Sequence, residues 1–162
     1  MWLSRLIAIL LVGMLTACTG LSVTPLGTNF TKDDLRVAVI GTGGRNGQIY
    51  SRALNSLIGG AADPAFTLSS ELSVASSSTL TVRGSSSNLQ KRSMTAKITL
   101  VDAATGETVM SDSISESSTV GTVSSYYAQT RSDKHSDERT SLLLAERVAA
   151  RVHLYFLDAK GQ

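Results

Sequence analysis

Four basic side chains lie close together near the middle of the chain: Arg83, Lys91, Arg92 and Lys97. No acidic residue occurs between Arg83 and Val101. Guanidinium and ammonium groups donate hydrogen bonds to phosphate and carboxylate oxygens, and arginine can do so with two nitrogens at once. This basic group therefore predicts contact with a phosphorylated lipid or with an acidic partner surface. The alternative is an ordinary solvated end of a β-hairpin, and the residues alone leave both interpretations open.

The only cysteine, Cys18, ends the segment Leu15-Thr16-Ala17-Cys18. An apolar run, Leu6 to Leu15, lies before it and follows Arg5, an order that is typical of an export signal. The run is shorter than the roughly 20 residues of a membrane-spanning helix. Leu-Thr-Ala-Cys resembles the lipobox of bacterial lipoproteins, which implies a diacylglycerol on the Cys18 sulfur and cleavage before it. We expect a signal peptide over residues 1–17 and a lipidated tether over 18–34; the alternative is a membrane helix or a secreted chain with a stray thiol.

A glycine-rich turn follows the apolar segment Val37 to Ile40, and a helix start follows the turn. Val37 to Gly47 resembles the opening of a nicotinamide-dependent oxidoreductase of the Rossmann type, in which backbone N–H groups at a helix N-terminus hold a pyrophosphate. The third glycine of that pattern would stand at Asn46, and Gly47 is one position late. The chain then continues in hairpins. We therefore expect a tight turn, in which glycines permit positive φ, and no bound cofactor.

Other residues of catalytic type give no clear site. Ser132, Asp133 and His135 are the residue types of a catalytic triad, but a triad is assembled in space rather than along one short segment. His135 and His153 have no metal-ligand spacing. We therefore expect no enzyme activity and no metal.

The elements that must position these residues follow from the periodicity. Leu35 to Ile40 predicts a buried strand. Apolar residues with helical spacing come next and predict one buried face of a helix: Ile49, Tyr50, Ala53, Leu54 and Leu57. Gly59-Gly60 predicts the end of that helix.

After Pro64 the apolar period becomes two, which predicts strands. Leu68, Leu72 and Val74 alternate with polar residues, Leu80 and Val82 continue the run, and the cleanest alternation is Met94, Ala96, Ile98 and Leu100. We expect a hairpin tip at Ser85 to Asn88, a turn over residues 102–106, a returning strand over 107–116 and a loop over 117–131. A last helix is expected to begin near Asp137 and Glu138. Its expected buried stripe is Leu142, Ala145, Val148, Ala149, Val152 and Phe156. The expected fold is α+β, a single domain over 35–158 with two helices on one face of a four-stranded sheet in the order β-α-β-β-β-α.

The composition excludes several functions. Lysine and arginine number 15 and aspartate and glutamate 13, and aromatic residues make up 5%. This balance disfavours nucleic-acid binding, which usually needs a strongly basic domain. A lipid on Cys18 would also leave no thiol for disulfides, metals or catalysis.

Four stretches together resemble the LPS-assembly lipoprotein (LptE) family in its α-proteobacterial form. They are the lipobox cysteine with Val23-Thr24-Pro25-Leu26-Gly27, the helix start Arg45 to Leu54, the segment Ala96 to Asp102 with Thr105-Gly106-Glu107, and Ser125-Tyr126-Tyr127-Ala128 before the helix Ala145 to Val152. The likeness lies in the order of these short stretches, and it covers nearly all of the chain after Cys18.

The resemblance implies a non-enzymatic protein at the inner leaflet of the outer membrane, facing the periplasm. Such a protein occupies a β-barrel LPS translocon (LptD), supports its assembly and helps lipopolysaccharide reach the outer leaflet. The basic group would then meet lipopolysaccharide phosphates. Two alternatives remain at this point: a lipoprotein accessory of another envelope transport or cell-wall system, and an exported NAD(P)-dependent oxidoreductase.

Overall fold

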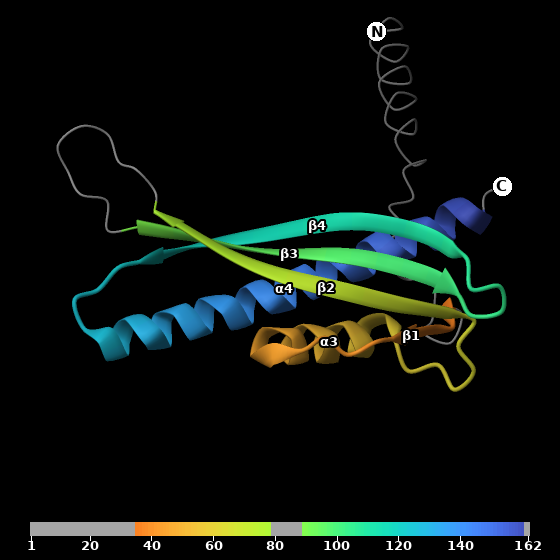
Figure 1. The fold of residues 1–162 in the computed structure, drawn as a ribbon, viewed down its shortest axis with the longest axis horizontal. Helices are drawn as coiled ribbons and strands as arrows, with labels where there is room; N and C mark the ends of the chain where they lie inside the picture. Colours follow the sequence, from red (N-terminus) through yellow and green to blue (C-terminus); the bar gives the residue numbers. More distant parts are fainter. Residues whose placement is uncertain (1–34, 79–88, 161–162) are drawn as a thin grey trace, which may run out of the picture.

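The computed structural model describes residues 35–78 and 89–160. The expected signal peptide, Cys18, the tether, Arg83 and the expected hairpin tip lie outside the described residues. The elements are β1 (Val37–Val39), α3 (Gly44–Ile58), β2 (Phe66–Ser78), β3 (Leu89–Asp102), β4 (Thr108–Gly121) and α4 (Tyr126–Lys160) (Figure 1).

The four strands form one mixed sheet in the order β1-β2-β3-β4, and both helices lie on the same face of it (Figure 1). The short strand β1 pairs in parallel with β2, and β2, β3 and β4 are antiparallel neighbours. The register sets Leu68, Leu100 and Met110 side by side across the sheet. This arrangement confirms the α+β fold and the element order predicted from the periodicity.

The hydrophobic core lies between the sheet and the two helices. The predicted alternation in β3 is confirmed, because Met94, Ala96, Ile98 and Leu100 are all buried. From α3, Tyr50, Leu54 and Ile58 are buried, while Leu57 is exposed, so the buried face ends at Ile58 and not at Leu57. The Tyr50 hydroxyl retains a polar partner, since it lies 3.0 Å from the Ser70 hydroxyl.

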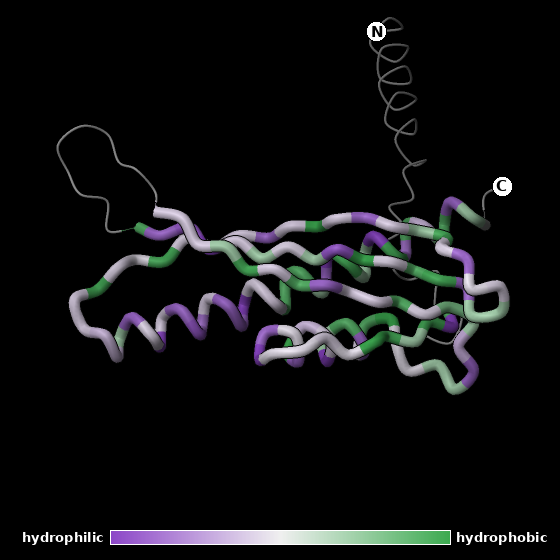
Figure 2. The backbone as a smooth tube through the Cα atoms, viewed as in Figure 1, coloured by the Kyte–Doolittle hydropathy of each residue, from purple (hydrophilic) through white to green (hydrophobic). Residues whose placement is uncertain are grey.

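The two helices differ greatly in length. With 35 residues, α4 is about 52 Å long, whereas the 15 residues of α3 extend about 22 Å. As a result α3 covers only the part of the sheet near β1, and α4 continues alone beyond Gly44 (Figure 1). We call the part of the domain beside residues 126–140 of α4 the distal end; apolar residues are sparse there and α4 is hydrophilic (Figure 2).

Two sequence-based boundaries are corrected at the distal end, and one residue is corrected in the buried stripe of α4. Residues 117–121 belong to β4, because Ser117 to Gly121 pair with β3 and complete the ladder, so serine content did not prevent a strand. Tyr126 to Arg131 form the first turns of α4 and not a loop. In the stripe of α4, Leu142 is 47% exposed, and the buried residue is Leu144. The rest of the predicted stripe is confirmed, because Ala145, Val148, Ala149 and Val152 are buried and Phe156 packs against the core.

The glycine turn between β1 and α3 serves packing. A Cβ on Gly47 would lie 2.6 Å from the Thr42 carbonyl oxygen, so α3 approaches the turn at a distance that only glycine allows. The Thr42 N–H donates a hydrogen bond of 2.9 Å to the Ser51 hydroxyl, which fixes the same contact. Gly44 has a φ of 76°, as expected for a turn that requires glycine.

In the part of the chain that the structure describes, no helix lies on the opposite face of the sheet, and hydroxyl side chains cover most of that face. Because side chains alternate between the faces of a strand, the residues one position away from the core positions point here. They are mainly serine and threonine: Thr67, Ser69, Ser73 and Ser77 in β2, Ser93, Thr95 and Thr99 in β3, and Ser111, Ser113, Ser115, Ser117 and Thr119 in β4. We call this surface the hydroxyl face.

Candidate functional site

The predicted basic group is divided by the fold. Arg83 lies outside the described residues. Lys91 and Lys97 are exposed and occupy hydroxyl-face positions of β3, whereas Arg92 takes the intervening position and faces the helices. Lys97 lies opposite Glu71 of β2 in the sheet register, so an acidic residue neighbours it. The three described cations therefore do not form one site.

Arg92 joins β3 to α4. Its Nε donates a hydrogen bond of 2.8 Å to Asp137 Oδ1, and its Nη2 donates one of 2.8 Å to Asp137 Oδ2. Its Nη1 lies 3.7 Å from Asp133 Oδ2. The Arg92 side chain is 18% exposed and that of Asp137 16% exposed. The hydrogen bonds to Asp137 raise the pKa of Arg92 above its ordinary value. Arg92 therefore forms a half-buried ion pair that joins β3 to α4, and its guanidinium is not available to bind a ligand.

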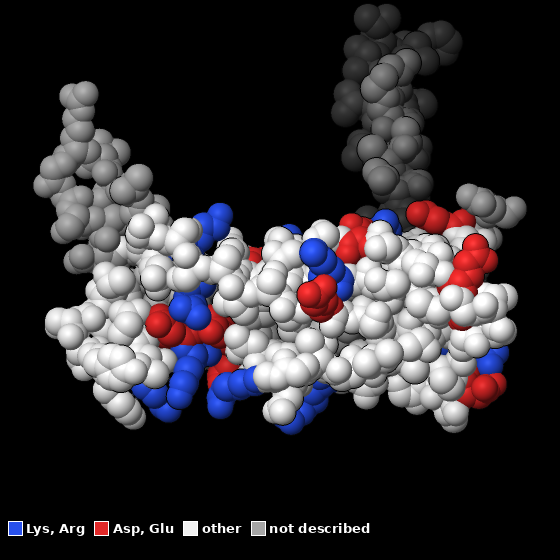
Figure 3. Space-filling model, viewed as in Figure 1, with Lys and Arg blue, Asp and Glu red and all other residues white. Residues whose placement is uncertain are grey.

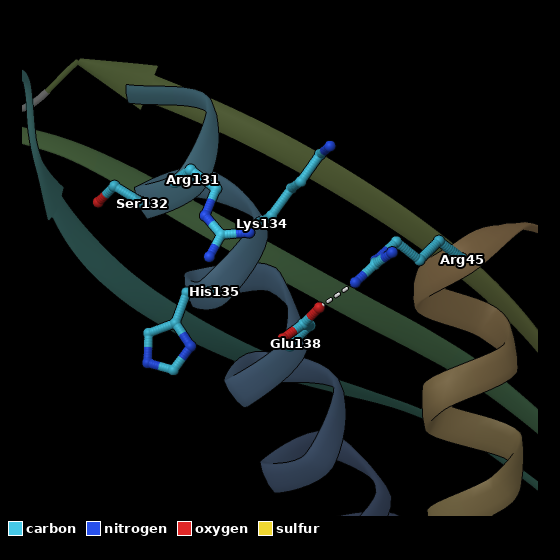
Figure 4. Close-up of a pocket in the computed structure, with 6 residues that line it drawn as sticks. All are labelled: Arg45, Arg131, Ser132, Lys134, His135 and Glu138. Carbon is cyan, nitrogen blue, oxygen red and sulfur yellow. Dashed lines mark hydrogen bonds and ion pairs between the residues drawn. The ribbon is translucent and has the colours of Figure 1, made fainter. Parts of the chain in front are cut away.

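A different group of charged residues lines a cleft at the distal end. The cleft has a volume of about 390 Å³ and lies between the start of α3 and the first half of α4 (Figure 4). Its lining is entirely polar: Arg45, Arg131, Ser132, Lys134, His135 and Glu138. We call it the distal cleft. Figure 3 shows acidic and basic side chains gathered at this end of the molecule.

Arg45 and Glu138 form an ion pair across the distal cleft and connect α3 to α4 (Figure 4). The hydrogen bond from Arg45 lowers the pKa of Glu138, and the charges of Arg45, His135 and Arg131 act in the same direction. Glu138 is therefore an anion at neutral pH. Among the described residues, the side chains of Arg131 and Lys134 have no hydrogen-bond or ion-pair partner.

The local sequence explains this arrangement. Arg131, Lys134, His135 and Glu138 have the spacing i, i+3, i+4 and i+7, which places them on one face of a helix. Farther along α4 the same face packs against α3, but at these positions α3 has not yet begun. This spacing was available in the sequence, but residues 126–131 were predicted as a loop, so the stripe was not recognised.

Arg45 belongs to the first turn of α3. Gly43 caps this helix without a side-chain hydrogen bond, and its first turn contains no acidic residue. The N-terminal end of a helix carries a partial positive charge from its unpaired N–H groups. Both the side chains and this helix end therefore favour an anion beside the cleft.

The three residues of triad type have different surroundings in the structure. Ser132 and His135 line the distal cleft, but Asp133 accepts a hydrogen bond of 2.8 Å from Gln129 and lies near Arg92. His153 is on the other half of α4, where burial lowers its pKa. Among residues 35–78 and 89–160, no group of His, Cys, Asp and Glu is positioned to hold a metal.

In the same described ranges, every helix is too short or too polar to cross a membrane.

Comparison with known proteins shows the fold. No protein-family model and no curated protein matches the sequence. Three solved structures share the fold: a candidate lipoprotein of Caulobacter crescentus (20% identity, TM-score 0.59), the rare lipoprotein B of Shewanella oneidensis (11%, 0.59) and a minor lipoprotein of Acinetobacter baumannii (6%, 0.56). The matches cover 74%, 76% and 73% of this chain, and 89%, 96% and 88% of those chains, respectively.

Proposed function

We propose that this chain is a lipid-anchored outer-membrane protein that occupies the β-barrel LPS translocon (LptD), assists its assembly and aids delivery of lipopolysaccharide to the outer leaflet. The observation that carries the proposal is the fold, which is shared with three proteins described as lipoproteins over most of their length. The lipobox-like segment ending at Cys18 gives the means of anchoring.

The stretches that resemble the LptE family support the proposal by their places in the fold. Arg45 to Leu54 is the first part of α3, and Ala96 to Asp102 is the buried end of β3. Ser125 to Ala128 marks the start of α4, and Ala145 to Val152 is its buried half. These stretches thus correspond to structural units, and three of the four contribute to the core or to a helix boundary.

The hydroxyl face is suited to the interior of a large barrel. Barrel interiors are polar and wet, and serine and threonine can donate and accept hydrogen bonds to water or to polar side chains. A lipid on Cys18 would hold the domain beside the membrane and raise its effective concentration near a barrel partner. The proposed role is non-enzymatic, because binding and support require no reacting group.

The test is capture of the full tagged chain from native outer membranes after cross-linking, followed by mass spectrometry. We expect an LptD-type barrel as the main cross-linked partner. A Cys18→Ser chain should lose the lipid mass and capture much less barrel. Efficient capture of a different transporter or of a cell-wall enzyme would overturn the proposal and favour the accessory role in another envelope system.

A further inference from the structure

We propose that the distal cleft binds a phosphate group, with Arg131 and Lys134 as its direct ligands and Arg45 as a third cation that exchanges Glu138 for the phosphate. This inference does not depend on the barrel role, since it concerns the isolated chain and a small anion. It also differs in position from the basic group of β3, which the fold divides between two faces.

The free cations are the first evidence. Arg131 and Lys134 are both exposed and lie one helical turn apart on the same face of α4. Three other arginines of the described chain form ion pairs, Arg92 with Asp137, Arg147 with Glu116 and Arg151 with Asp112. Among the described residues, the side chains of Arg52 and Arg139 have no such partner. Arg131 and Lys134 differ from those two arginines because they lie together in the lining of one cleft. An arginine beside a lysine suits phosphate, because guanidinium binds two oxygens and ammonium supplies a compact charge.

The Arg45–Glu138 pair is the second piece of evidence. It closes one side of the cleft, and Glu138 is the only acidic residue in the lining. The Arg45 side chain is 65% exposed, so the ion pair is weak and can be exchanged. A phosphate placed between Arg45, Arg131 and Lys134 would compete with Glu138 for Arg45. Glu138 therefore weakens anion binding and makes it depend on how readily this pair opens.

The shape and lining define the ligand. A volume of about 390 Å³ is near the lower end of small-molecule sites, which span about 300–1,000 Å³. Among the residues that the structure describes, those lining the cleft are all polar or charged. The lining residues therefore suit a polar phosphate-bearing group. Such a group could belong to a free phosphorylated compound or to the headgroup of a phosphorylated lipid.

The experiment uses the full chain in detergent micelles at 150 mM salt. One arm titrates inorganic phosphate, and the other titrates short-chain phosphatidic acid below its micelle-forming concentration, with short-chain phosphatidylcholine as the control lipid. Chemical shifts of the Arg and Lys side chains report binding. Saturable shifts with phosphate alone indicate a free anion, and shifts with phosphatidic acid alone indicate a lipid headgroup. Shifts with neither ligand overturn the proposal.

Two pairs of variants separate the site from net charge. Arg131→Ser with Lys134→Ser should weaken binding at least about tenfold, as expected when charged hydrogen bonds are lost. Arg52→Ser with Lys97→Ser, which removes the same two charges, should change it less than about twofold. Arg52 is exposed on α3 two turns beyond Arg45, and Lys97 is exposed on β3. Glu138→Gln should tighten binding several-fold, whereas Glu146→Gln, the same change of charge at an exposed site eight residues along α4, should not. Equal effects within either pair would overturn the proposal, and thermal melting verifies that each variant is folded.

Discussion

The three glycines before and within α3 should respond differently to alanine, although the sequence presents them as one motif. Gly43, Gly44 and Gly47 all lie in the segment that resembles a dinucleotide-binding turn. The structure gives each a different environment. Gly43 has a φ of −68° and Gly44 a φ of 76°, and neither would place a Cβ within 4 Å of another group. Gly47 has an ordinary helical position but is in close contact with Thr42.

The magnitudes follow from these environments. Gly47→Ala gains about 1 kcal/mol of helix propensity. It also forces the new methyl group against the Thr42 carbonyl oxygen and carbon, at 2.6 Å and 2.9 Å. Backbone atoms cannot rotate away, so the cost lies at or above the top of the usual overpacking range of about 1–3 kcal/mol. The net loss of stability should be about 2 kcal/mol.

The other two substitutions provide the comparison. Gly44→Ala should cost about 1 kcal/mol, because an alanine is strained at positive φ. Gly43→Ala should be close to neutral, since the loss of unfolded-chain entropy and the poorer helix cap nearly cancel, each being about 0.5–1 kcal/mol.

Urea unfolding of the full chain in detergent, followed by far-ultraviolet circular dichroism, measures the three free energies of unfolding. The expected order of stability is Gly43→Ala, then Gly44→Ala, then Gly47→Ala. If Gly47→Ala were as stable as the unmodified chain, the close packing of α3 on Thr42 would be refuted.

Two further predictions concern ion pairs. Arg92→Ala should lower the free energy of unfolding by about 2–3 kcal/mol, because it leaves the half-buried Asp137 carboxylate unpaired. Arg36→Ala, which breaks an exposed pair with Asp63, should lower it by less than about 1 kcal/mol. Similar losses for the two variants in urea unfolding would contradict the difference in burial. The hydrogen bond from Arg151 lowers the pKa of Asp112 in the folded chain, so its stabilisation is complete above the ordinary pKa near 4 and is lost as the pH falls through the lower folded-state value. Asp112→Asn should therefore be less stable than the unmodified chain at pH 7, and the difference should shrink as the pH falls below about 4. A difference in melting temperature that stays constant as the pH falls would refute the linkage.

The periodicity of the sequence predicted the fold well where one face of an element is buried. The alternation in β3 identified four core residues correctly, because a strand between two others must put every second side chain against the helices. The helix of Tyr50 and Leu54 was recognised for the same reason. In both elements the local pattern and the tertiary packing require the same residues.

The prediction was poorer where packing, and not local pattern, determines structure. Ser117 to Gly121 form a strand only because β3 is long enough to pair with them. Leu142, Leu143 and Leu144 are consecutive, so periodicity alone could not tell which one is buried; the rotation of α4 on the sheet buries Leu144. The distal cleft was missed because it depends on α3 beginning at Gly44 while α4 extends past it.

The unequal lengths of α3 and α4 also imply that the two ends of the domain differ in how easily they open. Among the described residues, most buried apolar side chains lie where both helices cover the sheet, and the distal end contributes few, such as Met94 and Val120. Regions with few buried apolar contacts exchange their amide hydrogens through local openings that cost much less than global unfolding. The distal strand ends and the first turns of α4 should therefore unfold locally as a separate cooperative unit while the core stays folded. A ligand that bridges Arg45 to α4 would make that opening less favourable. Binding at the distal cleft would therefore slow amide hydrogen exchange along the whole distal end.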